Sequence, residues 1–295
     1  MRIFDDTETM EAVDALAGGV WQREPCGTSI CGRKISVISA GCGEAAVLYV
    51  GAHHGMERLT AGLLTDFAAE AAREYARDGK VGEISVWELL RRFTIFLVPM
   101  LNPDGVRISL YGAGEAGERR AALNAMNGGD DFTRWQANAN GVDLNHNYDA
   151  GFAAYKVLER EAGIRIGPGR YAGERPESEP ETAFMCRLLR DLHPRLCGVL
   201  SLHTQGEEIF CGCETALSAK CRAVGRRLQS MTGYQMKIPT GLAAYGGLSD
   251  WCIETLRRPA FTLECGKGQN PLPPEDEPAI YVRLRRALFA FPFLL

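Results

Sequence analysis

The chain has no long uninterrupted apolar segment and no strong excess of either charge. Its 33 Lys and Arg stand against 37 Asp and Glu, which gives a formal net charge of −4. Because the basic residues are spread along the chain, the sequence does not favour binding to nucleic acid or to an anionic membrane surface. Asp5, Asp6 and Glu8 lie where a signal peptide needs an apolar core. We therefore expect a soluble, cytoplasmic protein without an export signal.

The sequence also lacks internal repeats, low-complexity tracts and the paired cysteine spacing of zinc fingers. There are ten cysteines, including the pair Cys211 and Cys213. In a chain of this length without a signal peptide, we expect reduced thiols, several of them buried as small hydrophobic side chains. The less favoured alternative is an oxidised secreted scaffold. The 295 residues are 46% hydrophobic and can bury a large core, so we expect one domain over residues 1–295, with two small domains as the alternative.

An apolar run over residues 47–50 leads into two histidines and a glutamate, and residues 59–76 then carry apolar side chains at helical spacing. The cluster is therefore predicted at a strand-to-helix turn, where open α/β sheets place their sites. His54 and Glu57 are three residues apart, so their side chains can converge on one metal ion at the start of a helix. His53 with Glu57 is the competing pair. Taken alone, the motif is also compatible with two histidines in a solvent loop.

Two further apolar runs end in residues of the same chemical types. Residues 196–203 end in His203, and residues 259–264 end in Glu264. If these runs are parallel strands, their carboxyl ends lie along one edge of the sheet and the side chains can meet. Two neutral imidazoles and one carboxylate leave a fourth position open on zinc, as in catalytic zinc sites. A second carboxylate is then needed as a general base toward water, and Glu264 fits that role.

The remaining pattern predicts further elements between these strands. We expect helices over residues 5–17, 84–92, 180–192, 215–232 and 276–290, and a central strand over 93–100. A turn at Gly41 predicts a hairpin-like start to the sheet. Residues 101–105 carry a turn signal, and residues 111–140 predict a long irregular excursion. Ser178 is interpreted as a helix N-cap, with Glu181 completing a capping box.

In order and together, these motifs resemble those of the zinc carboxypeptidase family, in particular its bacterial γ-D-glutamyl-diamino acid peptidases, which trim peptidoglycan peptides. The resemblance covers most of the chain. Beyond the His54-x-x-Glu57 motif it rests on Gly32-Arg33, Asn102–Gly105, Gly141–Asn145, Ser178–Glu181, Ser201–Glu208, Gly246-Gly247 with Asp250-Trp251, and Phe261–Glu264. It implies an α/β fold of the phosphorylase/hydrolase-like type, with a mixed, mostly parallel eight-stranded sheet and helices on both faces. It also implies one Zn²⁺ per chain, held by His54, Glu57 and His203, with Glu264 as the base and later the acid toward the leaving amine.

The chain departs from the family pattern where the substrate carboxylate is bound. Pancreatic members have an arginine directly after the residue that matches Asn145, whereas this chain has His146. A histidine is a weaker and pH-dependent partner, so carboxylate recognition is expected to be softer or supplied elsewhere, for example by Arg134 or Arg107. Tyr245 lies in a Gly-flanked loop that could close over substrate, with a packed aromatic as the equally favoured alternative.

A second departure concerns the arginine that stabilises the oxyanion in the family. Here Gln136 follows Trp135, and Arg134 precedes it. Either could serve, Gln136 as a neutral donor and Arg134 if the loop register differs. Complete loss of such a donor costs about a hundredfold or more in rate.

The sequence therefore predicts a zinc metallopeptidase that cleaves an amide bond next to a free carboxylate. The expected substrate is a small murein-derived peptide with a γ-D-glutamyl-diaminopimelate bond, and no nucleic acid or membrane partner is expected. One alternative is a zinc deacylase of the aspartoacylase or succinylglutamate desuccinylase type, which shares the zinc triad. The other is a catalytically silent homologue that only binds peptides.

Overall fold

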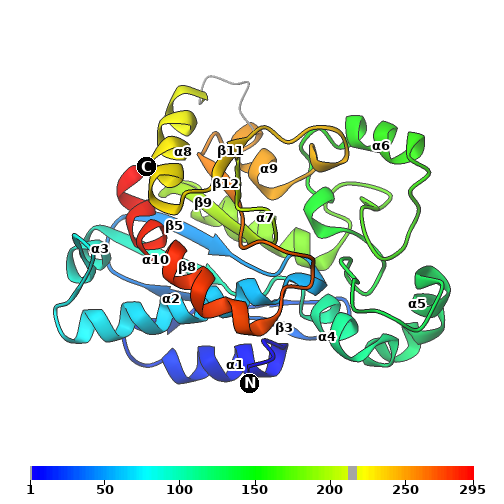
Figure 1. Ribbon diagram of the computed structural model, residues 1–295, viewed down its shortest axis with the longest axis horizontal. Coiled ribbons are helices and arrows are strands. Elements are labelled where there is room, and N and C mark those ends of the chain that lie inside the picture. Colours follow the sequence, from blue (N-terminus) through cyan, green and yellow to red (C-terminus); the bar gives the residue numbers. More distant parts are fainter. Residues whose placement is uncertain (1, 212–217) are drawn as a thin grey trace.

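The structure is a computed structural model that describes residues 2–211 and 218–295. An eight-stranded sheet forms its centre (Figure 1). Across the sheet the strands lie in the order β1 (Trp21–Arg23), β4 (Ile38–Ala40), β8 (Phe93–Val98), β5 (Ala45–Val50), β9 (Leu196–His203), β12 (Ala260–Glu264), β10 (Glu208–Phe210) and β11 (Gln235–Lys237). The central strands β8, β5, β9 and β12 are parallel. Antiparallel pairs join β1 to β4, β4 to β8 and β10 to β12, so the expected mixed, mostly parallel sheet is confirmed.

Helices cover both faces of the sheet because side chains alternate along the central strands. Along β5, Val47 and Tyr49 enter one core, while Leu48 and Val50 enter the other. The first core packs against α1 (Asp6–Leu16), α2 (Leu59–Ala76), α3 (Val86–Arg92), α8 (Ser218–Thr232) and α10 (Glu277–Leu294). The second core packs against α7 (Pro180–Leu192) and α9 (Leu248–Glu254). In Figure 1, α1, α2 and α10 accordingly lie together on one side of the sheet.

Shorter elements connect these layers. Three helices, α4 (Pro103–Tyr111), α5 (Arg120–Asn127) and α6 (Phe152–Glu161), lie on the side of the sheet toward which β5 points (Figure 1). The 3-10 helices are η1 (Gly55–Glu57), η2 (Ala113–Arg119), η3 (Leu144–His146), η4 (Gly241–Ala243) and η5 (Pro274–Asp276). Two small sheets pair β2 (Gly27–Thr28) with β3 (Lys34–Ile35) and β6 (Lys80–Val81) with β7 (Ile84–Ser85). Among the described helices, none combines the length and the apolar character that crossing a membrane requires.

The hairpin expected around Gly41 is wrong. Strands β4 and β5 do not pair with each other, because β8 lies between them in the sheet. The connection from β4 to β5 instead crosses the start of β8. At Gly41 and Gly43 a Cβ atom would collide with the backbone of Arg92 and Phe93, so this close crossing requires glycine.

Three other expectations need correction. Residues 101–105 are not a turn, because Asn102 caps α4 by accepting the Gly105 N–H at 2.8 Å and Pro103 occupies the first helical turn. The excursion over 111–140 is partly helical, since it contains η2 and α5, and the sequence pattern missed α6.

The expected helices over 5–17, 84–92, 180–192 and 276–290 are confirmed. Residues 215–217 of the helix expected over 215–232 lie outside the described residues, as does Cys213.

Several of the described cysteines are buried, as expected from the sequence. Buried Cys186, Cys252 and Cys265 act as small hydrophobic side chains, and Cys26 and Cys42 are exposed. All five are free thiols.

The start of α7 also differs from its expectation. Ser178 is not the N-cap, because Glu179 occupies that position and Ser178 Oγ donates to Glu179 Oε1 at 2.8 Å. Glu181 completes no capping box. Its buried carboxyl group instead accepts the Ile30 backbone N–H at 3.0 Å and the Asn138 side-chain amide at 3.3 Å, and it thereby ties the loop before η3 to α7.

Buried Glu181 makes stability depend on pH. Burial, together with the negative charge of Asp104, raises the pKa of Glu181 from 4.5 to about 7. Between these values the folded state binds more protons than the unfolded state, so this group's contribution to the free energy of unfolding decreases as pH rises. Glu181→Gln mimics the protonated form. We expect the variant to gain about 3 kcal/mol relative to the wild type between about pH 4.5 and pH 8.

Urea unfolding of both proteins at the two ends of this pH window measures the effect. Glu275→Gln, at an exposed position, is the matched control and should change stability equally at both pH values. A constant difference between Glu181→Gln and the wild type across the window would show that Glu181 stays charged in the folded protein.

Candidate metal centre

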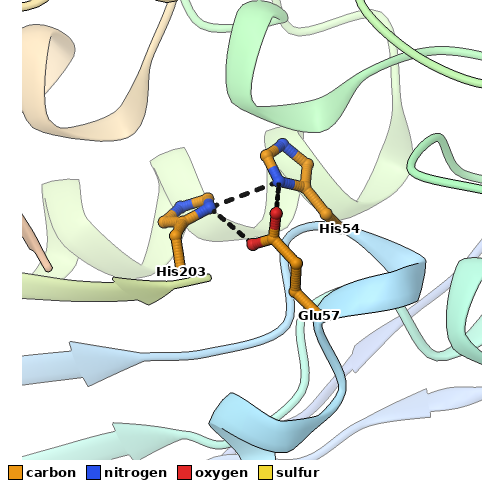
Figure 2. Close-up of side chains that lie close together, drawn as sticks. All are labelled: His54, Glu57 and His203. Carbon is orange, nitrogen blue, oxygen red and sulfur yellow. Dashed lines mark hydrogen bonds and ion pairs between the residues drawn. The ribbon is translucent and has the colours of Figure 1, made fainter. Parts of the chain in front are cut away.

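Three neighbouring parallel strands deliver the candidate site at their carboxyl ends. His54 follows β5, and Glu57 lies in η1 just before α2. His203 is the last residue of β9, and Glu264 is the last residue of β12, directly opposite His203 in the strand register. Figure 2 shows His54, Glu57 and His203 pointing toward one another from these separate segments. The convergence expected from the sequence is therefore confirmed.

The distances between the three side chains fit a shared metal ion. His54 Nδ1 lies 2.9 Å from Glu57 Oε1, and His203 Nδ1 lies 3.1 Å from Glu57 Oε2. The two Nδ1 atoms are 3.3 Å apart (Figure 2). Ligand atoms at about 2.1 Å from a tetrahedral zinc ion lie about 3.4 Å from one another, so little rearrangement is needed. The donor set of two imidazoles and one carboxylate is that of a catalytic zinc site.

The charges of these groups suit a cation. Burial alone would raise the pKa of Glu57, but His54 and His203 outweigh it and hold that pKa at about 2. Burial would lower the pKa of His54, but Glu57 and Asp143 outweigh it and raise that pKa well above its usual value. Burial lowers the pKa of His203. Nε2 of His203 is buried without a hydrogen-bond partner among the described residues, so the polar contacts of this ring run through Nδ1, which faces Glu57.

Asp143 orients the first ligand. Its Oδ1 lies 3.1 Å from His54 Nε2, and its Oδ2 accepts the Gln136 side-chain amide at 2.8 Å and the Arg170 backbone N–H at 2.9 Å. Burial opposes the charged form of Asp143, but His54 and these hydrogen bonds hold its pKa well below the usual range. A charged carboxylate at Nε2 keeps the proton there and leaves Nδ1 free for a metal. The sequence pattern does not indicate a separate role for Asp143.

The competing pair of His53 with Glu57 is not formed. His53 Nε2 lies 3.1 Å from the Tyr148 hydroxyl, and its Nδ1 lies 3.5 Å from Ser201 Oγ. The His53 ring stacks on His203 with 5.2 Å between centroids. His53 is therefore a buried neighbour of the site, and His54 is the histidine that faces Glu57.

A cavity of about 210 Å³ opens at the metal centre, lined by His54 and Glu57 of the three ligands. Glu264 faces it, and burial together with the negative charge of Glu57 raises the pKa of Glu264 well above its usual value. A bound cation would oppose this shift, because it offsets the charge of Glu57. The other residues expected in the site that line this cavity are Gln136, Asn145, His146 and Tyr245.

Neither of the two arginines proposed from the sequence for substrate binding lines the cavity. Arg134 is exposed and does not line the cavity, and Arg107 is paired with Asp6 and Glu115. Arg170 does line it, although the sequence pattern does not indicate this. The available signal was an arginine directly after the glycine-rich segment 167–169 inside an expected polar loop.

His146 and Tyr245 form part of the cavity wall. The His146 ring stacks on Tyr155 at 4.0 Å between centroids, and its Nδ1 lies 3.0 Å from the Tyr245 carbonyl oxygen. Burial lowers the pKa of His146, so its imidazole is neutral at neutral pH. The Tyr245 side chain is 43% exposed at the rim, which argues against a packed aromatic there.

Fold and site together define the class of this protein. The fold is a mixed α/β sheet, and the ends of its parallel strands bring two histidines and a glutamate together beside a cavity that a further glutamate faces. This combination is that of a zinc peptidase. The chain is a member of the zinc carboxypeptidase family, whose model matches residues 7–282.

Known proteins agree with this assignment. The chain is 32% identical over 262 residues to gamma-D-glutamyl-L-diamino acid endopeptidase 1 of Lysinibacillus sphaericus, and the match covers 88% of this chain and 64% of that protein. It is 33% identical over 300 residues to the uncharacterized protein YqgT of Bacillus subtilis (strain 168), covering 98% of this chain and 78% of that one. The structure of carboxypeptidase A from Helicoverpa armigera superimposes with a TM-score of 0.76 at 16% identity, covering 100% of this chain and 74% of that one.

Proposed function

We propose that this protein is a zinc metallopeptidase that hydrolyses γ-D-glutamyl amide bonds to a diamino acid, such as the γ-D-glutamyl-diaminopimelate bond of murein peptides. The observation that carries the proposal is the placement of Glu264 beside a complete set of zinc ligands: it shares a cavity with His54 and Glu57 and lies opposite His203 in the strand register. The substrate class is supported by the 32% identity to an endopeptidase named for γ-D-glutamyl-L-diamino acid bonds.

The chain's own residues supply the rest of the chemistry. Zinc, held by His54, Glu57 and His203, would polarise the substrate carbonyl and lower the pKa of a water molecule. Glu264 would accept a proton from the attacking water and then pass it to the leaving amine. Its position at the end of β12, beside His203, fixes the distance between base and metal ligand through the backbone of two paired strands.

Neighbouring amides would bind the substrate. Gln136 has two side-chain N–H groups, of which Asp143 accepts one. The Gln136 amide nitrogen also lies 3.1 Å from His54 Nε2, but that ring nitrogen carries the proton held by Asp143 and cannot accept, so the second N–H would serve the developing oxyanion in place of the family's arginine. Asn145 accepts the Leu248 N–H through Oδ1, which leaves its NH₂ group for substrate. Tyr245 would close over the bound peptide from the rim.

Product release tests the proposal. Zinc-loaded protein should release the diamino acid from L-alanyl-γ-D-glutamyl-meso-diaminopimelate, as measured by amine-specific chromatography. It should not release amino acids from N-acetyl-aspartate or N-succinyl-glutamate, the substrates of the deacylase alternative. Full activity in protein stripped of metal would overturn the proposal, and so would tight peptide binding without any product.

We further propose that the protein works in the cytoplasm. The exposed thiols Cys26 and Cys42 suit a reducing compartment. Fractionation of the producing cells tests this location.

A further inference from the structure

The residues that line the cavity over the metal ligands are unequally charged. Carboxylates come from Glu57, Asp250 and Glu264, whereas Arg170 is the single lysine or arginine among the described lining residues. In the part of the chain that the structure describes, no carboxylate forms an ion pair with the Arg170 guanidinium. This cation is therefore available to an anionic group of a ligand.

Arg170 is held in an unusual backbone conformation. Its φ of +65° is in the left-handed region, which is unfavourable for a non-glycine residue and persists only where surrounding contacts enforce it. The enforcing contacts are present on both sides of the peptide. The Arg170 N–H donates to Asp143 Oδ2 at 2.9 Å, the Arg170 carbonyl accepts the Tyr155 hydroxyl at 2.7 Å, and the Tyr171 carbonyl accepts the Asp143 N–H at 2.7 Å.

The same carboxylate connects Arg170 to the metal centre. Asp143 holds His54 with one oxygen and the Arg170 backbone with the other. The side chain of Arg170 thus starts one hydrogen bond away from the group that orients a metal ligand. The backbone at position 170 therefore keeps a fixed relation to the metal centre, and the guanidinium reaches the cavity from that fixed point.

The other candidates for carboxylate recognition are uncharged, paired with acidic residues or outside the cavity. The His146 ring is stacked on Tyr155 and is neutral, because burial, with the positive charge of Arg170 among the further causes, lowers its pKa. Arg134 is outside the cavity, and Arg107 is neutralised by Asp6 and Glu115. Among the described residues, Arg170 alone combines a permanent charge with a place at the rim of the cavity.

We propose that Arg170 is the specificity-determining residue that binds the free carboxylate of the substrate's diamino acid. This inference rests on the proposed function. A guanidinium binds a carboxylate through two parallel N–H···O bonds, which a neutral histidine cannot provide. The residue is supplied by the segment over residues 167–175 and replaces, from a different place in the chain, the arginine that is missing after Asn145.

Paired substrates test the proposal. The probes are γ-D-glutamyl-L-lysine and its C-terminal amide, which differ only in the carboxylate. The wild type should prefer the free acid. Arg170→Ala should lower kcat/KM for the acid by about 10- to 100-fold, mainly through KM, and should leave the amide within about twofold. Arg170→Lys should recover part of the loss, because lysine restores the positive charge but cannot form the two parallel N–H···O bonds. Arg134→Ala, at the exposed arginine outside the cavity, is the matched control and should match the wild type.

Calorimetric binding of the same two probes to metal-free protein gives a readout that is independent of hydrolysis. Arg170→Ala should lose the preference for the acid there as well. An unchanged acid-to-amide ratio in Arg170→Ala would overturn the inference, while continued cleavage would leave the proposed function intact. If the wild type cleaves neither probe but still binds the acid through Arg170, the proposed hydrolysis is wrong and the role of Arg170 in carboxylate binding stands. If Arg170→Ala melts at a lower temperature than the wild type, Arg170→Gln takes its place in the same comparison.

Discussion

Replacing His203 with alanine should remove both zinc and hydrolysis. The imidazole supplies one of three protein ligands, and its Nδ1 faces Glu57 at 3.1 Å, so the variant leaves a histidine and a carboxylate that hold zinc far less tightly. We expect zinc content to fall from about one per chain to near zero. The rate should fall by more than about a thousandfold, because removing a single oxyanion donor already costs up to that much.

Metal analysis after dialysis measures the first effect, and product release measures the second. A chelator should lower the melting temperature of the wild type, which loses the stabilisation due to bound metal, but not that of His203→Ala. His193→Ala is the matched control, because His193 contacts the Leu256 carbonyl oxygen and lies away from the site. Stoichiometric zinc in His203→Ala would mean that other residues hold the metal.

Replacing Glu264 with glutamine should abolish most hydrolysis while zinc stays bound. The substitution keeps the size of the side chain but removes the carboxylate that we propose takes the proton from water, and general acid–base catalysis contributes about 10²- to 10⁴-fold. Glu264 is not one of the three zinc ligands, so zinc content should match the wild type. The expected result is a loss in kcat by that factor with little change in KM.

The control for this variant lies on the adjacent strand. Glu208 on β10 is opposite Glu264 in the register, and its side chain pairs with Lys237. Because the negative charge of Glu208 also contributes to the raised pKa of Glu264, Glu208→Gln should shift the pH profile of kcat to slightly lower pH and keep wild-type turnover at its optimum. Wild-type kcat in Glu264→Gln would require a different base.

Local sequence pattern was sufficient for the parts of the fold that depend on nearby residues. The apolar runs that became β5, β9 and β12 are continuous because each strand is buried on both faces, and the polar residues that end them stand out for that reason. The three strand ends therefore indicated Glu57 with one of the two neighbouring histidines, His203 and Glu264, and the family resemblance selected His54.

The remaining errors arise where the outcome depends on distant residues. The order of strands places β8 between β4 and β5, and nothing near Gly41 in the sequence shows this. Ser178 has the right residue type for a cap, but buried Asn138 and Asn147 use Glu179 and Ser178 as partners. Arg170 was missed because its place in the cavity depends on a hydrogen bond to Asp143, 27 residues away.

The anchoring of Arg170 by its backbone has a consequence for how this protein could change its substrate. Asp143 contacts the main chain at position 170 and not the guanidinium, so any residue that tolerates this conformation can occupy the position without disturbing His54. Substrate preference can thus diverge by exchange of one side chain while the hydrolytic machinery stays intact. Exchanging residues 167–175 between related proteins should therefore transfer substrate selectivity without altering the metal centre.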